Sequence, residues 1–297
     1  MAMVYSRLVF LVSICILVSQ ATDQPDFLYH FCLDDNGNYT SNSTYKANLN
    51  QLLSSLSSNT EIDYGFYNFS YGQYPNKVYS IGLCRRDVIP YNCRSCLNNA
   101  TNLLPQFCPN QKEAIVWYEG YMLRYLFRDI FNIKETRPSF WMWNKNNVST
   151  NLDQFNQDLK ILLDSKRVQA AAGGSLRKFA AGNATAPNNQ TLYSLVQCTP
   201  DLSEQDCSDC LAWAFGKIPQ CCGGKQGGRY ITPSCYFRFE VYLFYVAKAD
   251  NASSPSPSPS PPLVPSVSPP PLNKTAAAKG TNELLALLNV DCSIVIS

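Results

Sequence analysis

The sequence predicts an α+β protein built from two tandem modules, each with an antiparallel sheet. The first observation behind this prediction is a duplicated cysteine frame. The spacing C-x8-C-x2-C occurs from Cys84 to Cys96 and again from Cys198 to Cys210. Four cysteines recur in fixed register, since Cys84, Cys93, Cys96 and Cys108 correspond to Cys198, Cys207, Cys210 and Cys222. A repeat in constant register indicates two homologous modules.

The second observation is that each module mixes helical and strand patterns without a regular βαβ alternation. Each begins with apolar residues at helical spacing: Leu49, Leu52, Leu53 and Leu56 in the first, with Ser43 or Thr44 as N-cap, and Phe155, Leu159, Leu162 and Leu163 in the second. The stretches IDYGFYNF and NKVYSIGLC then predict strands. The segment after Cys93, with Cys96, Leu97, Ala100 and Leu104, predicts a second helix. The strands that close the modules are expected in EAIVWYEG, MLRYLFRDIF and CYFRFEVYLFYVA.

The first 21 residues predict a secretory signal peptide. Arg7 precedes an apolar core from Leu8 to Val18, and small residues lead to cleavage after Ala21. The apolar run is shorter than the roughly 20 residues of a membrane span. Residues 22–132 and 133–247 are then the two modules of a chain that matures under oxidising conditions.

Charge and sequons agree with a secreted protein. Loss of Arg7 lowers the formal charge from +2 by one, which leaves no electrostatic bias toward nucleic acid. N-x-S/T sequons for glycosylation are numerous: Asn38, Asn42, Asn68, Asn99, Asn147, Asn183, Asn189, Asn251 and Asn273.

The composition changes after the second module. Residues 248–280 alternate Ser and Pro, which favours an extended polyproline spacer. Residues 281–297 form an irregular tail that Asn289 and Asp291 interrupt and that is too short to span a bilayer. A lipid-anchor signal is the alternative interpretation of this tail.

The cysteines can be assigned to zinc, to redox chemistry or to disulfides. A zinc site needs four thiolate or imidazole ligands, and His30 is the only histidine. The C-x2-C pairs lie inside a larger repeated frame, which disfavours a thioredoxin-like role. We therefore expect disulfides, with no metal and no cofactor.

The cysteine frame, the sequence FWMWNKNNVS between the modules and the CC followed by GGKQGGRY resemble the ginkbilobin-like, or salt-stress-response/antifungal, domain of plants. The resemblance covers roughly Tyr29 to Ala247. It extends to cysteine-rich repeat secretory proteins and to the ectodomains of cysteine-rich receptor-like kinases, here without a membrane span or kinase domain. It implies a five-stranded antiparallel sheet packed with two helices and stapled by three disulfides in each module.

The resemblance also implies particular disulfides. In the first module it pairs Cys84 with Cys93 and Cys32 with Cys108. The position that should hold the partner of Cys96 is Tyr121, so Cys96 is expected either to bridge two chains or to be a buried thiol. In the second module it pairs Cys198 with Cys207 and Cys210 with Cys235. For Cys221 and Cys222, a vicinal bridge, a pairing with Cys292 and two thiols are all compatible with the sequence.

Ginkbilobin-like proteins bind mannose through an asparagine, an arginine and a glutamate. The corresponding positions of the first module are Leu33, Ile115 and Leu126, which exclude this site there. The second module offers Arg229 and Glu240, while the asparagine position falls near Lys145. The alternative role of Arg229 and Glu240 is an ion pair across two strands.

Nothing in the sequence can be assigned a catalytic role, since His30 has no matching acid, base or nucleophile. We therefore expect a non-enzymatic recognition protein, secreted into the apoplast, that acts in plant defence or stress signalling. Its partners would be mannose-type glycans or cell-surface proteins, with no nucleic acid. One alternative is an antifungal lectin that binds mannose. Another is a truncated receptor ectodomain that acts as a decoy by associating with copies of itself or with related receptors through exposed aromatic strands.

Overall fold

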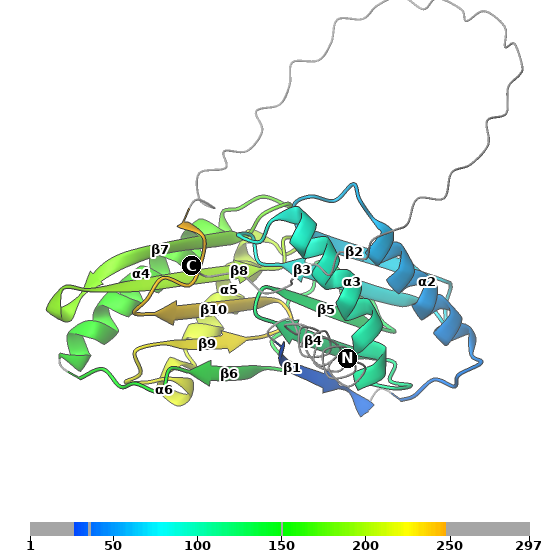
Figure 1. The fold of residues 1–297 in the computed structure, drawn as a ribbon, viewed down its shortest axis with the longest axis horizontal. Helices are drawn as coiled ribbons and strands as arrows, with labels where there is room; N and C mark the ends of the chain where they lie inside the picture. The colour runs from blue at the N-terminus through cyan, green and yellow to red at the C-terminus, as the bar shows by residue number, and fades with distance from the viewer. Residues whose placement is uncertain (1–26, 35–36, 150, 248–297) are drawn as a thin grey trace, which may run out of the picture.

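The computed structural model describes residues 27–34, 37–149 and 151–247, which form two five-stranded antiparallel sheets with helices (Figure 1). The first module contains β1 (Phe27–Cys32), α2 (Thr44–Ser58), β2 (Phe66–Tyr71), β3 (Val78–Cys84), α3 (Pro90–Phe107), β4 (Ala114–Tyr118) and β5 (Tyr121–Leu126). The second contains β6 (Phe140–Trp143), α4 (Leu152–Ala171), β7 (Phe179–Ala186), the 3-10 turn η2 (Pro187–Asn189), β8 (Gln190–Cys198), α5 (Glu204–Phe215), α6 (Ile218–Cys221), β9 (Gly228–Ile231) and β10 (Cys235–Glu240).

The strand orders of the two sheets correspond, which confirms the predicted α+β class and the repeat. They are β1-β4-β5-β3-β2 and β6-β9-β10-β8-β7. Figure 1 shows the modules side by side, with β1 and β6 along one edge of the molecule and β2 and β7 along the opposite edge. Stacking of Tyr29 on Phe140, with ring centroids 5.4 Å apart, brings β1 and β6 into contact.

The helices begin and end for local reasons. The Ser43 side chain caps α2 by accepting a hydrogen bond from the backbone N–H of Lys46 at 3.2 Å. The four predicted leucines of α2 are all buried. Helix α3 begins at Pro90, before Cys93, which corrects the expected start after that cysteine. Proline fits the first turn of a helix, where no backbone donor is needed.

The segment CYFRFEVYLFYVA is only half a strand, which corrects the prediction. Strand β10 ends at Glu240, and the chain then returns toward the first module. Phe244 is fully buried, and the backbone N–H of Val246 donates to Asp87 Oδ2 at 3.1 Å. Phe244 and Tyr245 pack with apolar residues of the second module, while hydrogen bonds from Arg85 to the Phe244 carbonyl and from Val246 to Asp87 hold the segment beside the first module.

Five disulfides lie within the described residues. They join Cys32 to Cys108, Cys84 to Cys93, Cys198 to Cys207, Cys210 to Cys235 and Cys221 to Cys222. The first four are the pairs that the resemblance implies, and the fifth is the vicinal bridge among the three arrangements considered for that pair. Cys96 is 2% exposed and packs in the core of the first module with Tyr121. Its burial favours the buried-thiol alternative over a bridge between chains.

The remaining sequence features lie partly outside the described residues. The seven described sequon asparagines, from Asn38 to Asn189, are exposed. The predicted signal segment, the predicted Ser/Pro spacer and the tail lie outside the described residues, as do Asn251, Asn273 and Cys292. Among the helices that the structure describes, none has the length and hydropathy to cross a bilayer.

The helix-free faces of the two sheets pack against each other. Apolar side chains of the first sheet, including Ile115, Trp117 and Met122, form one cluster with Phe140 and Ile231 of the second. Polar contacts add to this interface, since the Gln197 side chain donates to the backbone carbonyl of Cys84 at 3.0 Å. The two modules therefore share a core in addition to having one each.

Candidate functional site

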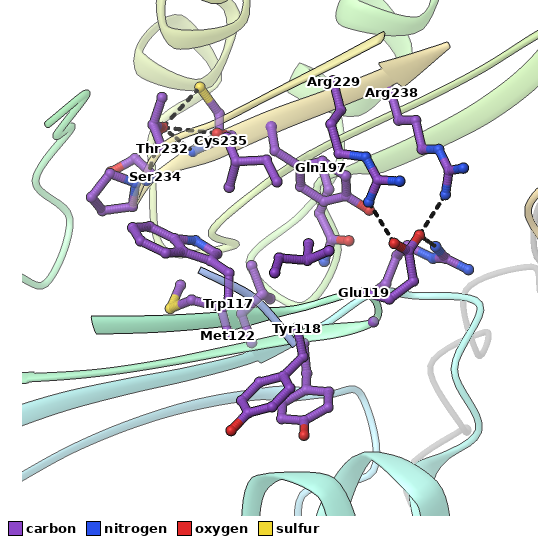
Figure 2. Close-up of a pocket in the computed structure, with 18 residues that line it drawn as sticks. Trp117, Tyr118, Glu119, Met122, Gln197, Arg229, Thr232, Ser234, Cys235 and Arg238 are labelled. Carbon is purple, nitrogen blue, oxygen red and sulfur yellow. Dashed lines mark hydrogen bonds and ion pairs between the residues drawn. The ribbon is translucent and has the colours of Figure 1, made fainter. Parts of the chain in front are cut away.

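Glu119 lies at the tight turn between β4 and β5 of the first module and points into the second module. Two arginines from neighbouring strands of the second sheet meet it. Arg229 of β9 and Arg238 of β10 are directly opposite each other in the strand register, and each forms an ion pair with Glu119 (Figure 2). We call Glu119, Arg85, Arg229 and Arg238 the junction cluster.

Arg85 completes the junction cluster from the first module. Its Nη1 lies 3.4 Å from Glu119 Oε1, and its Nε and Nη2 form a two-pronged contact with Asp87 at 2.6 and 2.8 Å. The Arg85 side chain is 3% exposed. Two-pronged contacts of this kind fix both the position and the orientation of a guanidinium. Arg85 also donates to the carbonyl of Phe244 at 3.4 Å, so it links the returning segment to the junction.

The electrostatics of the cluster favour an ionised Glu119. Burial alone would raise the pKa of this carboxyl, but the charges of Arg229, Arg238 and Arg85 outweigh burial and hold the pKa below its usual value. Burial would likewise lower the pKa of Arg85, while Tyr236, Asp87 and Glu119 raise it above its ordinary value. Glu119 and Arg85 are therefore both ionised at neutral pH.

Glu240 belongs to a second contact set beside the junction cluster. Its Oε1 accepts from Arg238 Nε and Nη2 at 3.3 and 3.2 Å, and its Oε2 accepts from Asn144 Nδ2 at 3.2 Å. Glu240 is 5% exposed. A methyl group at Gly227 would overlap the Glu240 carboxylate, so a residue with a side chain at position 227 would displace it. The glycine-rich loop therefore makes room for a buried acid.

These contacts show which partners the predicted sugar-site residues Arg229 and Glu240 have in the structure. Arg229 and Glu240 lie on the same face of the sheet, but Arg229 pairs with Glu119 and Glu240 pairs with Arg238. The sequence-based alternative of an ion pair between Arg229 and Glu240 is therefore wrong. The asparagine that reaches Glu240 is Asn144, the residue before Lys145. Glu119 and Arg238 were not predicted, because their partners lie in the other module or two residues along the same strand.

The pocket at this junction is small. It lies between Trp117, Met122 and Leu83 of the first module and Ile231 and Tyr236 of the second, with the arginines at one end (Figure 2). Its volume is about 50 Å³. Pockets that bind small molecules have volumes of about 300–1,000 Å³. The junction pocket is therefore a narrow gap at the interface of the two modules, and it is too small to enclose a sugar ring.

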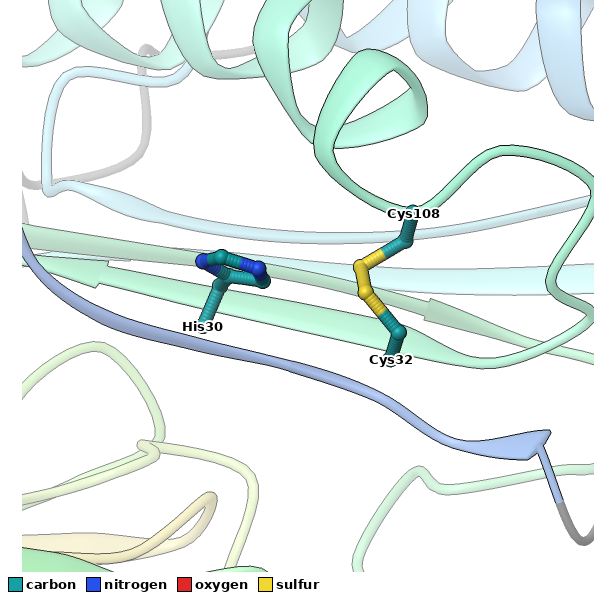
Figure 3. A group of neighbouring side chains, drawn as sticks. All are labelled: His30, Cys32 and Cys108. Carbon is teal, nitrogen blue, oxygen red and sulfur yellow. A yellow bond between two sulfur atoms is a disulfide. The ribbon is translucent and has the colours of Figure 1, made fainter.

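A second group of residues has the composition of a metal site. His30, Cys32 and Cys108 place their ligand atoms within 4.8 Å of one another (Figure 3). Metal binding requires deprotonated thiolates. The sulfurs of Cys32 and Cys108 are bonded to each other instead, and the His30 ring stacks on Phe107 with centroids 5.2 Å apart. In the oxidised protein this group packs β1 against the end of α3.

The other groups with shifted pKa values also have structural roles. Burial raises the pKa of Tyr45, Tyr67, Tyr125 and Tyr236. The Tyr45 hydroxyl donates to the carbonyl of Lys112 at 2.6 Å. Burial lowers the pKa of Lys178, whose Nζ donates to the carbonyls of Ala171 and Gly173 at the end of α4. Each of these groups lies inside a core or at a helix end, where it stabilises the fold.

Two disulfide-stapled α+β modules that share one core and one ionic junction define a tandem-domain protein. The model of the family described as "Salt stress response/antifungal" matches residues 31–128 and 142–242. The chain therefore belongs to this family.

Relatives with this domain include both receptor kinases and secretory proteins. The chain is 43% identical to cysteine-rich receptor-like protein kinase 29 of Arabidopsis thaliana over 89% of this chain and 39% of the relative. It is 40% identical to cysteine-rich repeat secretory protein 38 of the same plant, over 79% of this chain and 91% of that protein. The chain thus spans 33–41% of the receptor-like kinases that it matches and 85–91% of the secretory proteins.

Solved structures show the same tandem fold. The tandem DUF26 ectodomain of the Arabidopsis thaliana receptor-like protein PDLP8 matches with a TM-score of 0.60 and 23% identity, over 73% of this chain and 98% of that one. The corresponding ectodomain of PDLP5 matches with a TM-score of 0.57 and 26% identity, over 73% of this chain and all of that one. These matches agree with the five-stranded sheets and the helix layers described above.

Proposed function

We propose that this chain is a non-enzymatic extracellular recognition protein that acts in plant defence or stress signalling. The observation that carries the proposal is the junction cluster, which joins two modules into one rigid body. A binding protein benefits from such rigidity, because a preorganised surface loses less conformational entropy when it binds. Among the groups with shifted pKa values, Glu119 and Arg85 belong to the junction cluster, whereas Tyr45, Tyr125 and Lys178 lie in a module core or at a helix end.

The relatives support the same proposal. Some are named as secretory proteins, and others are kinases of which only part corresponds to this chain. The matched structures are ectodomains of receptor-like proteins. Disulfides and exposed sequons suit a protein outside the cell. We place the mature chain in the apoplast, where it would contact glycans or proteins of the cell surface.

Binding of the labelled mature protein to intact plant cells tests this function. We expect saturable binding that an excess of unlabelled protein displaces, since a specific surface recognises a limited number of partners. The same protein after reduction and alkylation is the control, because it lacks the folded surface. Binding that rises without saturation, or that the alkylated protein reproduces, contradicts the proposal.

Mannose binding is the second candidate, and one observation favours it. Asn144 donates to Glu240 beside Arg238 and Arg229, so the asparagine, acid and arginine types of the family's sugar site gather at one end of the second sheet. The existing partners of Arg229 and Glu240 oppose it, because a sugar would have to replace Glu119 and Arg238. The proposed lectin activity therefore requires rearrangement of the junction cluster.

Calorimetric titration with mannose and mannan separates the two candidates. If the lectin proposal holds, the mature protein releases heat on titration, and Asn144→Ala and the double variant Arg229→Ala/Glu240→Ala lose this heat. Asn144→Ala is the cleaner variant, since Asn144 lies outside the ion pairs that join the modules. Absence of heat with the mature protein contradicts the lectin candidate and leaves protein recognition.

A further inference from the structure

The four edges of the two sheets differ in how open they are to another strand. The edge strands β2 and β7 carry sequons at the exposed residues Asn68 and Asn183, and a glycan there would crowd an incoming chain. Strand β1 has a register shift between Phe27 and Tyr29, and such irregularities protect sheet edges. Strand β6 itself contains no sequon, since Asn147 lies four residues past its end, and it pairs in regular register with β9.

The free side of β6 presents the backbone groups of two exposed tryptophans. The backbone N–H of Asn144 donates to the carbonyl of Gly227 at 2.9 Å, so the backbone N–H and C=O groups of Asn144 are directed toward β9. The direction of the backbone N–H and C=O groups alternates along an antiparallel strand. Those of Met142 and Phe140 are therefore also directed toward β9. The N–H and C=O groups of Trp141 and Trp143 point away from the sheet. These two residues are 47% and 53% exposed.

Aromatic side chains flank this edge on the helix-covered face of the sheet. Trp141 stacks on Tyr230 with an interplanar angle of 5°, and Trp213 packs edge-on against the same tyrosine at 5.7 Å. Lys217 Nζ lies 4.9 Å from the centre of the Trp213 ring. Three of the four tryptophans of the chain thus lie at or beside β6. Tryptophan is enriched among the residues that dominate binding energy at protein interfaces.

The charges around β6 are positive. Between Glu135 and Asp153 the only charged residues are Arg137 and Lys145, one on each side of the strand, and both are exposed. In an antiparallel pair of two β6 strands centred on Trp141, Arg137 of each copy would lie opposite Lys145 of the other. Like charges directly opposite each other destabilise strand pairing. This register therefore disfavours a second copy of the chain, and the two flanking cations suit an acidic partner.

We propose that β6 binds an extended acidic peptide segment of another protein, which adds to the second sheet as a sixth strand. The backbone of the segment pairs with Trp141 and Trp143, its acidic side chains meet Arg137 and Lys145, and its apolar side chains contact the exposed tryptophans. Main-chain pairing supplies affinity in such strand addition, and side chains supply specificity. This inference rests on the proposed recognition function, to which it gives a surface and a class of partner.

Titration of the mature protein with synthetic peptides tests the inference through tryptophan fluorescence. The probe is an alternating valine–glutamate peptide of about eight residues, a common strand length. The comparison peptides replace glutamate by lysine or carry N-methyl groups on the valines, which remove the donors for strand pairing. We expect saturable binding of the glutamate peptide and at least about fivefold weaker binding of both comparison peptides, because each removes one source of complementarity.

Charge reversal in the protein supplies the matched variants. Lys145→Glu should weaken binding of the glutamate peptide by about fivefold, because the substitution reverses one of the two charges that flank β6. Lys160→Glu, on the exposed face of α4, makes the same change away from β6 and should have no effect. Circular dichroism verifies that both variants are folded.

Three results would overturn the inference: equal binding of the glutamate and lysine peptides, unchanged binding of the N-methylated peptide, or dimerisation of the mature protein through β6 in sedimentation experiments. If Lys145→Glu still binds plant cells saturably and no peptide binds, the recognition function holds and the β6 inference fails. If the cells are not bound but the glutamate peptide is, the edge exists and the cellular function is wrong.

Discussion

Replacement of Glu119 by glutamine should lower the free energy of unfolding by about 3 kcal/mol near neutral pH, since removal of one partner leaves buried charges uncompensated. Glu119 contacts three arginines whose side chains are 3%, 15% and 8% exposed, in the order Arg85, Arg229 and Arg238. Glutamine keeps the size of the side chain and removes its charge. Denaturant unfolding of the mature protein measures the effect.

The effect of Glu119→Gln should depend on pH in a defined direction. The pKa of Glu119 in the folded protein is below its usual value. Its stabilisation is therefore complete above the ordinary glutamate pKa of about 4.3, and is lost as the pH falls through the lower folded value. The difference between the mature protein and Glu119→Gln should be full at neutral pH and shrink as the pH falls below about 4.

Glu61→Gln is the matched control for this substitution. Glu61 is exposed in the loop before β2, and the same chemical change there should alter the free energy of unfolding by less than about 0.5 kcal/mol. Equal stability of Glu119→Gln and Glu61→Gln at neutral pH would show that the junction cluster does not stabilise the tandem arrangement. A difference that persists unchanged at low pH would show that the charge of Glu119 is not its cause.

Removal of the Cys32–Cys108 disulfide should destabilise the first module more than removal of Cys84–Cys93. The two bridges close loops with sequence separations of 76 and 9 residues. In the chain-entropy model these loops correspond to about 4.5 and 2.6 kcal/mol. The longer bridge also ties the edge strand β1 to the end of α3, so its loss should release β1 from the sheet.

Two double variants measure this difference under the same conditions. Cys32→Ala/Cys108→Ala and Cys84→Ala/Cys93→Ala each remove one bridge from the same module, so the rest of the protein serves as an internal control. Hydrogen exchange of the β1 backbone should accelerate in the first variant and not in the second. Equal losses of stability, or β1 exchange that is unchanged in both variants, would contradict the loop-length argument.

Local patterns in the sequence were sufficient for several elements of the fold. The apolar spacing from Leu49 to Leu56 and from Phe155 to Leu163 predicts helices correctly, because one buried face imposes a period of 3.6 residues. The repeated cysteine frame predicts the duplication. The strands around Val78 and Ala114 were found because β-branched and aromatic residues cluster there.

Other elements were beyond local patterns. Strands β1 and β6 are edge strands of six and four residues, and only Phe140 among their residues is buried, so neither strand shows the apolar run of a core strand. The five-stranded sheets followed only from the family resemblance. The end of β10 at Glu240 was also missed, since the next residues are equally apolar. Two of them, Phe244 and Tyr245, are buried in a cluster of second-module residues outside the strand, and hydrophobicity alone does not distinguish this burial from that of a strand residue.

The sequence by itself determined that the chain has two homologous modules, which residues form their helical cores and which residue types gather near the second sheet. The tertiary structure decided the partners of the charged residues. Glu119 lies 110 residues from Arg229 and 119 from Arg238, and no local pattern links them. Their meeting depends on how two separately folded sheets pack. The spacing of apolar residues indicates which face of a helix or strand is buried. It does not indicate which part of the other module packs against that face, and the ion pairs between the modules depend on that packing.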